Sequence, residues 1–465
     1  MNRFYQTLIH PNPTEADLQA VWDALGVAGD LALFAELRRH IFALIDASRD
    51  LMFTEAFGFG PFALTDILDF LFTESVFEFS LNRRKQAHVL YGLAHAKLRR
   101  SLLNGLPKPV RRAVMFQKCA HFGLFKKIAD YLVDSGVIPD PSLFQVDWVT
   151  DLTDVGMGHS VYRVSLAVGE VQTDIIVKRE NLVNQTFFCE LLPQLGLPSF
   201  FAKHVHDAQG QMWELTECLG DCLLTSLIDE QGLLPGVLEQ LANHAALGDV
   251  FGRGDRHGEN YMVRNDQILP IDISFLFADD NEFWTEKYIQ GGVYEFSCIP
   301  FGSFETVLAQ MTTFFRGYDA FFAKLQSQQS HLITAINAFY GNNSHTHHKR
   351  AFLKERLVAS FPIEQRRRYI RAWGELCERR FYKAALKTLA SLWPDSVWQE
   401  PWLKMYYLAD DQRPSAFFLI EDQQEPIFEK IRAQMTLYGL DITALDAQLA
   451  EAKVLTQALQ DALSA

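Results

Sequence analysis

The stretch GDRHGENYMVRNDQILPIDISFLF, residues 254–277, decides how the rest of the sequence is interpreted. It places Asp255, His257 and Asn260 in the pattern Asp-x-His-x-x-Asn, and a second carboxylate, Asp272, follows an apolar segment. The residues between Asn260 and Asp272 have the alternation and the turn residues of a short β-hairpin. Such a hairpin would bring Asn260 and Asp272 to the same end, where their side-chain oxygens could chelate one Mg²⁺.

Phosphoryl transfer from ATP needs this combination of groups. It requires ligands for a divalent metal and a group near the acceptor hydroxyl that orients it or takes its proton. In a protein-kinase catalytic loop, an Asn follows the Asp at the same spacing, and a metal-binding Asp comes after it. We therefore expect residues 254–260 to form a catalytic loop. In this loop either Asp255 or His257 would act on the acceptor, while Asn260 and Asp272 would hold the metal.

The cation that holds the nucleotide phosphates is expected upstream. Segments 146–155, 160–168 and 173–180 are short, β-rich and partly alternating, which predicts three antiparallel strands. Lys178 ends the third strand and could contact the α- and β-phosphates of ATP. Glu190 lies in a predicted helix, residues 184–196, from which it could pair with Lys178.

The connection between the first two strands is a candidate phosphate loop. It is short and contains two glycines, but Val161 stands where a third glycine would fall in a kinase. On its own it is therefore a weak glycine-rich loop. The residues that we expect to contact the nucleotide here are Gly156, Gly158, His159 and Ser160.

The order of predicted elements defines three regions. Residues 1–145 are expected to form a helical N-terminal domain, which ends in a linker at 136–144. Residues 146–220 would form a β-rich, nucleotide-binding N-lobe. Residues 221–465 would form a mostly helical C-lobe with a helical extension, including helices at 236–252, 362–393 and 442–463. The fold class is therefore predicted to be α+β, a two-lobed kinase fold with added N- and C-terminal helical regions.

Composition and charge indicate a globular protein with one basic surface. The chain has 465 residues, of which 48% are hydrophobic, and a net charge of −14. Region 82–127 nevertheless contains twelve Lys and Arg residues and no Asp or Glu. This asymmetry predicts an anionic partner, such as an acidic peptide or a membrane surface, although solvated helix faces would give the same pattern. No nucleic-acid-binding motif is present, so nucleic acid is not expected.

The sequence also bears on compartment and metal binding. Six scattered cysteines without a CxxC pair, no signal peptide and no long apolar run predict a cytoplasmic protein with no transmembrane segment. Two groups could bind zinc on paper, but we expect the first to be strand and hinge and the second to be a mobile polar loop. The first is His204, His206, Cys218 and Cys222, and the second is His345, His347 and His348.

Two resemblances to known families start from these motifs. GDRHGEN, residues 254–260, is very close to the GDRHxxN loop of the atypical kinases that include phosphatidylinositol 3- and 4-kinases. Those kinases continue with Asp-Phe-Gly, whereas this chain has Asp272, Ile273 and Ser274. This resemblance implies that the kinase fold is of the atypical, lipid-kinase-like type.

The second resemblance is to the dehydratase domain of type II lanthionine synthetases and covers about residues 150–280. GHSVYRVSLAVGEVQTDIIVKREN, residues 158–181, resembles that family's GxSVxxLxFxxGxxLVYKPR stretch, and ILPIDISFLF, residues 268–277, resembles its PVLIDLETLF. Arg179 stands where the family has Pro. The resemblance implies that Lys178 holds phosphate, Asp255 and His257 are catalytic, and Asn260 and Asp272 bind metal.

The same resemblance implies a reaction. The family phosphorylates Ser or Thr of a peptide and then eliminates the phosphate, using an arginine that cannot be placed here. The candidates are Arg366, Arg367, Arg368, Arg371 and Arg413. A full synthetase also carries a cyclase with a Cys/Cys/His zinc site, which this sequence does not show, so cyclisation is not expected.

The sequence therefore predicts an ATP- and Mg²⁺-dependent phosphotransferase. Its acceptor would be a Ser or Thr hydroxyl of a peptide or protein, with or without subsequent elimination. One alternative is a phosphoinositide kinase, or a protein kinase without elimination. A further alternative is a catalytically inactive nucleotide-binding scaffold.

Overall fold

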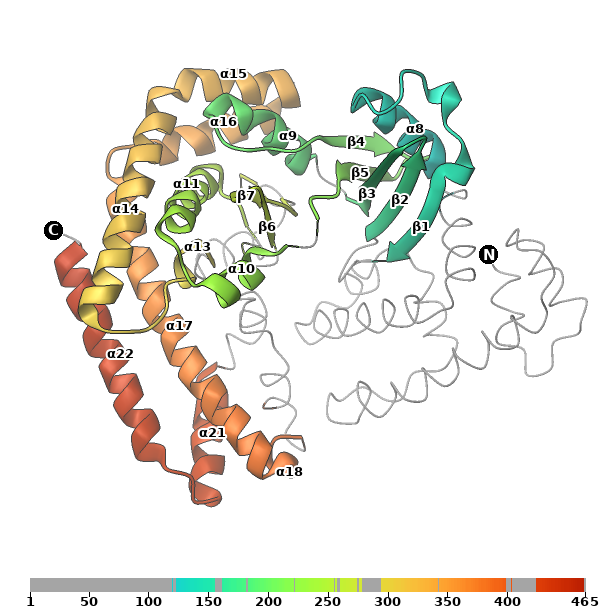
Figure 1. Cartoon of the computed structure of the whole chain (residues 1–465). Helices are drawn as coiled ribbons and strands as arrows, with labels where there is room; N and C mark the ends of the chain where they lie inside the picture. Colours follow the sequence, from blue (N-terminus) through green and yellow to red (C-terminus); the bar gives the residue numbers. More distant parts are fainter. Residues whose placement is uncertain are drawn as a thin grey trace, which may run out of the picture. The chain divides into compact units, whose positions relative to one another are not determined.

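The computed structural model divides into two compact units (Figure 1). It describes residues 123–154, 161–180, 183–220, 222–254, 260–273, 294–341, 343–398 and 424–463, and isolated residues between these ranges. The first unit comprises the described residues up to Thr186 and Phe200–Cys218; the second comprises Phe187–Ser199 and the residues from Leu219 onward. Most of the predicted N-terminal helical domain, and nearly all of the basic region 82–127, lie outside the described residues.

The first unit contains a five-stranded antiparallel sheet with the order β1-β2-β3-β5-β4. The strands predicted at 146–155, 160–168 and 173–180 are confirmed as the first three, and helix α9, Asn184–Leu191, follows as expected. His204 and His206 lie on a further strand, β4. The strand bounds are Val149–Asp154 (β1), Val161–Val168 (β2), Val171–Arg179 (β3), Ala202–His206 (β4) and Met212–Glu217 (β5).

One face of this sheet packs against helix α8, Leu124–Asp134. Leu124, Ile128 and Leu132 recur every four residues, so they form one apolar stripe of the helix. They share a buried core with Tyr162 and Trp213 of the sheet. The predicted linker, residues 136–144, carries a short 3-10 helix, Pro141–Leu143. The first residues of the predicted strand 146–155 form a second 3-10 helix, Val146–Trp148, so the strand begins only at Val149.

The second unit is mostly helical, with one two-stranded hairpin near its centre. The structure is therefore α+β, as predicted. The elements are α10 Leu224–Gln231, α11 Pro235–Phe251, β6 Tyr261–Arg264, β7 Gln267–Pro270, α13 Tyr294–Ser297, α14 Phe304–Ser327, α15 Gln329–Tyr340, α16 Ser344–Arg356, α17 Phe361–Leu392, α18 Pro394–Trp398, α21 Gln424–Leu437 and α22 Ile442–Leu463.

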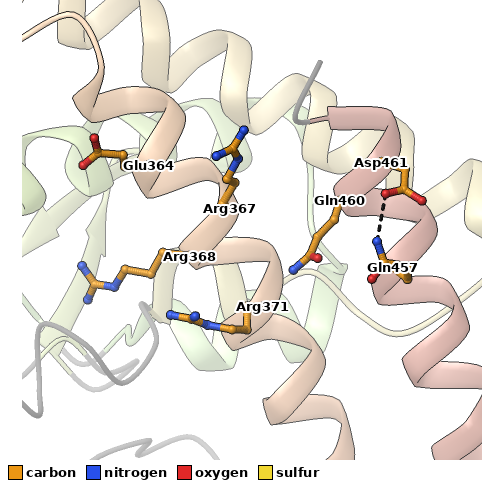
Figure 2. A pocket seen from close by; sticks show the side chains of 7 residues that line it. All are labelled: Glu364, Arg367, Arg368, Arg371, Gln457, Gln460 and Asp461. Carbon is orange, nitrogen blue, oxygen red and sulfur yellow. Dashed lines mark hydrogen bonds between the residues drawn. The ribbon is translucent and has the colours of Figure 1, made fainter.

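The helices predicted at 362–393 and 442–463 are confirmed as α17 and α22, which run side by side (Figure 2). Gly374 of α17 faces Thr456 of α22 so closely that a Cβ at Gly374 would lie 2.4 Å from the Thr456 hydroxyl oxygen. The absence of a side chain at Gly374 thus permits the close contact. None of the described helices is both long and apolar enough to cross a membrane.

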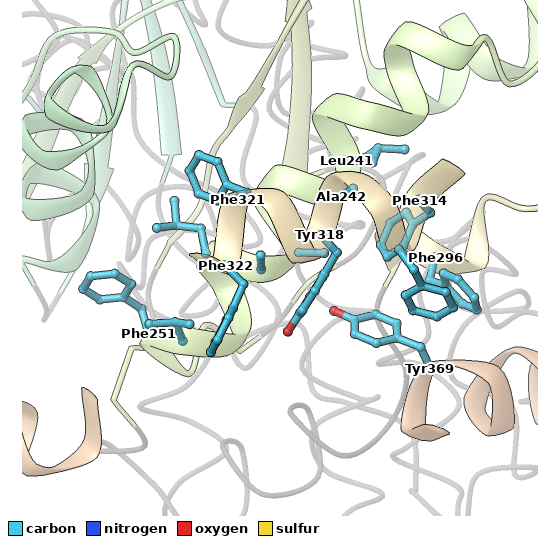
Figure 3. Packing of buried hydrophobic residues seen from close by; sticks show 14 of the residues in the cluster. Leu241, Ala242, Phe251, Phe296, Phe314, Tyr318, Phe321, Phe322 and Tyr369 are labelled. Carbon is cyan, nitrogen blue, oxygen red and sulfur yellow. The ribbon is translucent and has the colours of Figure 1, made fainter. Parts of the chain in front are cut away.

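The core of the second unit is built around α11 and α14 (Figure 3). Helix α11 is buried on nearly all sides, which explains why its apolar residues show no single stripe. Gly317 of α14 lies against Ala242 of α11, so the two backbones approach closely. Phe314, Phe321 and other phenylalanines fill the surrounding space, which accounts for part of the high phenylalanine content of the chain, 37 residues.

The expectation of a mobile polar loop at His345, His347 and His348 is wrong, because these residues lie in the first turns of α16. The side chain of Asn343 accepts a hydrogen bond from the Thr346 backbone N–H at 2.9 Å and caps the helix. Phe352 and other buried side chains of α16 then anchor it to the core. Tertiary packing and the cap outweigh the low intrinsic helix preference of the histidines.

Candidate functional site

One group of predicted site residues lies in the first unit, at the end of strand β3. Lys178 is paired across the sheet with Val161 of β2 on one side and with Glu214 of β5 on the other. Val161 is the first residue after the β1–β2 connection, so that connection joins the sheet directly opposite Lys178. The predicted nucleotide contacts in the connection, Gly156, Gly158, His159 and Ser160, lie outside the described residues.

Lys178 is a buried cation whose carboxylate partner lies two residues further along the chain. Only 7% of its surface is exposed, and its Nζ lies 2.8 Å from a carboxylate oxygen of Glu180, which is equally buried. Residues two apart in extended chain point to the same side, so the pairing follows from the sequence Lys-Arg-Glu. Sequence analysis did not single out Glu180. The carboxylate that it did propose, Glu190, is exposed at the end of α9, and its pairing with Lys178 stays a prediction.

A separate group of predicted site residues lies in the second unit, at the open end of the β6–β7 hairpin. Tyr261 is paired with Pro270, and one step further the backbone N–H of Ile271 donates to the carbonyl of Asn260 at 2.9 Å. Asn260 and Asp272 therefore lie at the same end of the hairpin, as predicted. At the other end, Asn265 and Asp266 both have left-handed φ angles, 52° and 60°, which define a two-residue turn of the type that closes tight hairpins.

Asp272 has an unusual backbone conformation for a residue with a side chain. Its φ is +56°, in the left-handed region that only Asn, Asp and Gly enter readily. Asp272 is partly buried, and Asn260 beside it is 3% exposed. Sparsely populated backbone conformations of this kind concentrate at functional sites. A carboxylate and an amide oxygen at one hairpin end are the donor set that suits Mg²⁺, so the described residues fit this ion.

Asp255 and His257, the predicted catalytic residues, lie outside the described residues, but Arg256 between them is described. The Arg256 side chain is almost fully buried and is held by two carboxylates. Its Nη1 lies 2.7 Å from Oδ1 of Asp249, and its Nε lies 2.9 Å from Oε1 of Glu295. A buried charge with two opposite partners is strongly position-specific. Arg256 therefore fixes the chain at the centre of the predicted catalytic loop.

Tyrosine hydroxyls complete this buried cluster. Tyr318 and Tyr369 donate to Oδ2 of Asp249 at 2.8 and 2.9 Å, and Tyr261 donates to Glu295. Burial raises the pKa of Tyr318 and Tyr369 well above its usual value, so both remain hydrogen-bond donors. The two carboxylates are thus satisfied by hydroxyls as well as by Arg256, which is the condition under which buried charges are tolerated.

Arg253 connects the start of the loop to the hairpin. It is 1% exposed, and it donates to the Tyr261 hydroxyl at 2.8 Å and to the Ile271 carbonyl at 3.2 Å. Because Ile271 precedes Asp272 directly, Arg253 holds the backbone on both sides of the hairpin base. Sequence analysis missed Arg253, Asp249 and Glu295. The sequence offers a signal only for Arg253 and Arg256, which are cations that follow an apolar helix closely.

No protein-family model and no curated protein matches this chain. The function is therefore argued from the residues of the site. The structure brings Asn260 and Asp272 together in the second unit and pairs Lys178 with Val161, the first residue of β2, in the first.

Proposed function

We propose that this protein is an ATP- and Mg²⁺-dependent phosphotransferase with a two-lobed, lipid-kinase-like fold, which acts on hydroxyl groups. The observation that carries the proposal is the hairpin end. A left-handed Asp272 and a buried Asn260 lie next to each other there, directly after a loop anchored by buried Arg256. Phosphoryl transfer depends mainly on positioning and electrostatics, and this arrangement supplies rigid oxygen ligands.

The roles of the residues follow from their chemistry. Asn260 and Asp272 would hold Mg²⁺, which neutralises charge on the phosphates when it is bound. Lys178 would hold the α- and β-phosphates, together with the β1–β2 connection that joins the sheet opposite it. Asp255 or His257 would orient the acceptor hydroxyl or take its proton. The Arg256 cluster and Arg253 would keep the loop and the hairpin in register.

We propose a Ser or Thr hydroxyl of a peptide or protein as the acceptor, with phosphate elimination after transfer. The sequence resemblance to lanthionine synthetase dehydratases supports this choice, and the basic region 82–127 suits an acidic peptide. The similarity of GDRHGEN to the phosphatidylinositol kinase loop supports a phosphoinositide acceptor as the second candidate. Mass spectrometry separates the reactions, because stable phosphorylation adds a phosphoryl group whereas elimination leaves a product lighter than the substrate by one water.

The first experiment measures the melting temperature with and without ATP and Mg²⁺. A ligand at a hundredfold excess over its Kd stabilises the folded state by about 2.7 kcal/mol. Asp272→Asn is the test variant, because Asn tolerates the left-handed conformation but removes the charge. Asp266→Asn is its matched control, since Asp266 is exposed in the turn at the other end of the same hairpin and shares the left-handed φ.

We expect magnesium-dependent stabilisation by ATP in the native chain and in Asp266→Asn, and its loss in Asp272→Asn. Equal stabilisation in all three proteins would refute the metal role of Asp272. No stabilisation of the native chain would refute the phosphotransferase proposal. Nucleotide binding without any product on peptides or lipids would favour the inactive scaffold.

A further inference from the structure

A cavity of about 580 Å³ lies between helices α17 and α22, and its lining includes none of the proposed nucleotide and metal residues. Figure 2 shows Arg367 and Gln460 reaching into the space between the two helices, and Arg368 and Arg371 extending together from α17. The lining residues are Glu364, Arg367, Arg368 and Arg371 of α17, with Gln457, Gln460 and Asp461 of α22.

The three arginines form one basic stripe. Positions 364, 367, 368 and 371 follow the three- and four-residue spacing of a single helix face. None of Arg367, Arg368 and Arg371 forms an ion pair with any residue that the structure describes. Arg366, on a neighbouring face of α17, does pair with Asp319 of α14. Within the described residues, the stripe that lines the cavity therefore differs from Arg366 in forming no ion pair.

Arg368 is the most unusual member of the stripe. Its Nη1 donates to Oε1 of Gln365 at 3.0 Å, but its Nε and Nη2 are buried and have no hydrogen-bond acceptor within the described structure. Burial lowers the pKa of Arg368 because desolvation penalises the charged form. The Asp249 carboxylate offsets part of this desolvation, but two N–H groups of the Arg368 guanidinium still lack a hydrogen-bond acceptor within the described structure, so a ligand with acceptor oxygens would satisfy them.

The other lining groups indicate which kind of ligand the cavity suits. Gln457 donates through Nε2 to Oδ1 of Asp461 at 2.8 Å, which occupies part of this carboxylate. The Gln460 amide adds a further donor, and exposed Glu364 lies at the N-terminal end of the stripe. Three guanidinium groups against two carboxylates leave a net positive cavity. Several N–H donors that line one cavity suit a compact ligand with several acceptor oxygens, as a phosphate group has.

We propose that this cavity is a binding site for a phosphate group, held by Arg367 and Arg371 and attracted by the buried charge of Arg368. The ligand would be inorganic phosphate or a phosphate monoester, which share the tetrahedral oxyanion. The site is formed by α17 and α22 and includes none of the nucleotide or metal residues. Its three arginines are among the candidates for the elimination step of the proposed function, but phosphate binding is tested here without nucleotide or metal, so its failure is distinguishable from failure of that function.

Calorimetric titration of the full chain with sodium phosphate, against sodium chloride at equal ionic strength, tests the site. Arg371→Gln is the main variant, because its exposed side chain can be changed without disturbing the core. Arg368→Gln is the second variant, and its melting temperature is measured beside that of the native chain so that a loss of fold is separated from a loss of binding. The matched control is Arg316→Gln, an exposed arginine on α14 that does not line the cavity. A parallel titration with phosphoserine distinguishes a monoester from free phosphate.

We expect phosphate to bind the native chain and Arg316→Gln equally, and to bind Arg371→Gln and Arg368→Gln at least about tenfold more weakly, as the loss of one charged hydrogen bond implies. Tighter binding of phosphoserine than of phosphate would identify a monoester ligand. Absence of phosphate binding by the native chain would overturn the proposal. Equal binding by all four proteins would also overturn it, because the phosphate would then be bound elsewhere, for example at the nucleotide site.

Discussion

Replacing Arg256 by Met tests whether the buried cluster holds the catalytic loop in place. Met has nearly the same length as the aliphatic part of Arg, so the substitution removes the charge and leaves most of the volume filled. It deprives Asp249 and Glu295 of their common cation at 2.7 and 2.9 Å, and it removes the donor to the Tyr369 hydroxyl at 3.1 Å. Both carboxylates stay buried without the cation that is hydrogen-bonded to them.

The expected loss of stability is large. Removing one member of a buried ion pair typically costs about 3–5 kcal/mol, because the remaining charge is uncompensated. Arg256 has two such partners, which are 1% and 0% exposed, so the upper part of this range applies. For a unit of this size, about 3–5 kcal/mol corresponds to a decrease in melting temperature of roughly 6–20 °C.

Urea denaturation followed by circular dichroism, with melting curves, measures this loss. The matched control is Arg432→Met in the same unit, because Arg432 pairs with Asp446 at 2.6 Å but both side chains are substantially exposed. Exposed pairs contribute about 0–1 kcal/mol, so the control should be nearly neutral. A change below about 1 kcal/mol in Arg256→Met, or one equal to that of the control, would show that the cluster does not anchor the loop.

Two further predictions concern the same unit. Gly252→Ala should destabilise the protein by more than about 2 kcal/mol in urea denaturation, because Gly252 has a φ of +62° and a Cβ there would lie 2.4 Å from the Phe352 ring. Gly439→Ala isolates the backbone cost, because Gly439 follows the end of α21 with φ +71° and the same backbone hydrogen-bond pattern as Gly252 and has no atom near its Cβ, so an equal loss in both variants would contradict the steric argument. Burial lowers the pKa of His244 to about 4, whereas unfolded His titrates near 6.5, so stability should fall as the pH falls through this window, by up to about 3 kcal/mol. His244→Phe should flatten this part of the stability curve, and an unchanged slope would show that His244 is not responsible.

Local patterns predicted most of the secondary structure. The hairpin after Asn260 was identifiable because Asn265 and Asp266 separate two apolar runs, and those residues adopt the left-handed turn that their side chains favour. The long helices α17 and α22 were identifiable from periodicity and length. In each case the determining interactions lie within a few residues along the chain, where sequence reasoning is strongest.

The contacts that support the site could not be predicted in the same way. Arg256 meets Glu295 across 39 positions and Tyr369 across 113, and no local pattern specifies such pairs. The histidines of α16 were misassigned for a related reason. Their helix depends on the cap from Asn343 and on packing of Phe352 against a distant core, which composition does not report.

The two-residue turn of the hairpin fixes the spacing between Asn260 and Asp272. Each strand has four residues, and the two turn residues connect them directly. The paired strands therefore determine how many residues separate Asn260 from Asp272. Adding or removing one residue in either strand would reverse which side chains face each side beyond that point. We therefore expect insertions and deletions in variants of this chain to be excluded from residues 260–272 and tolerated outside them. A library of single-residue insertions, scored for nucleotide binding, would map this boundary directly.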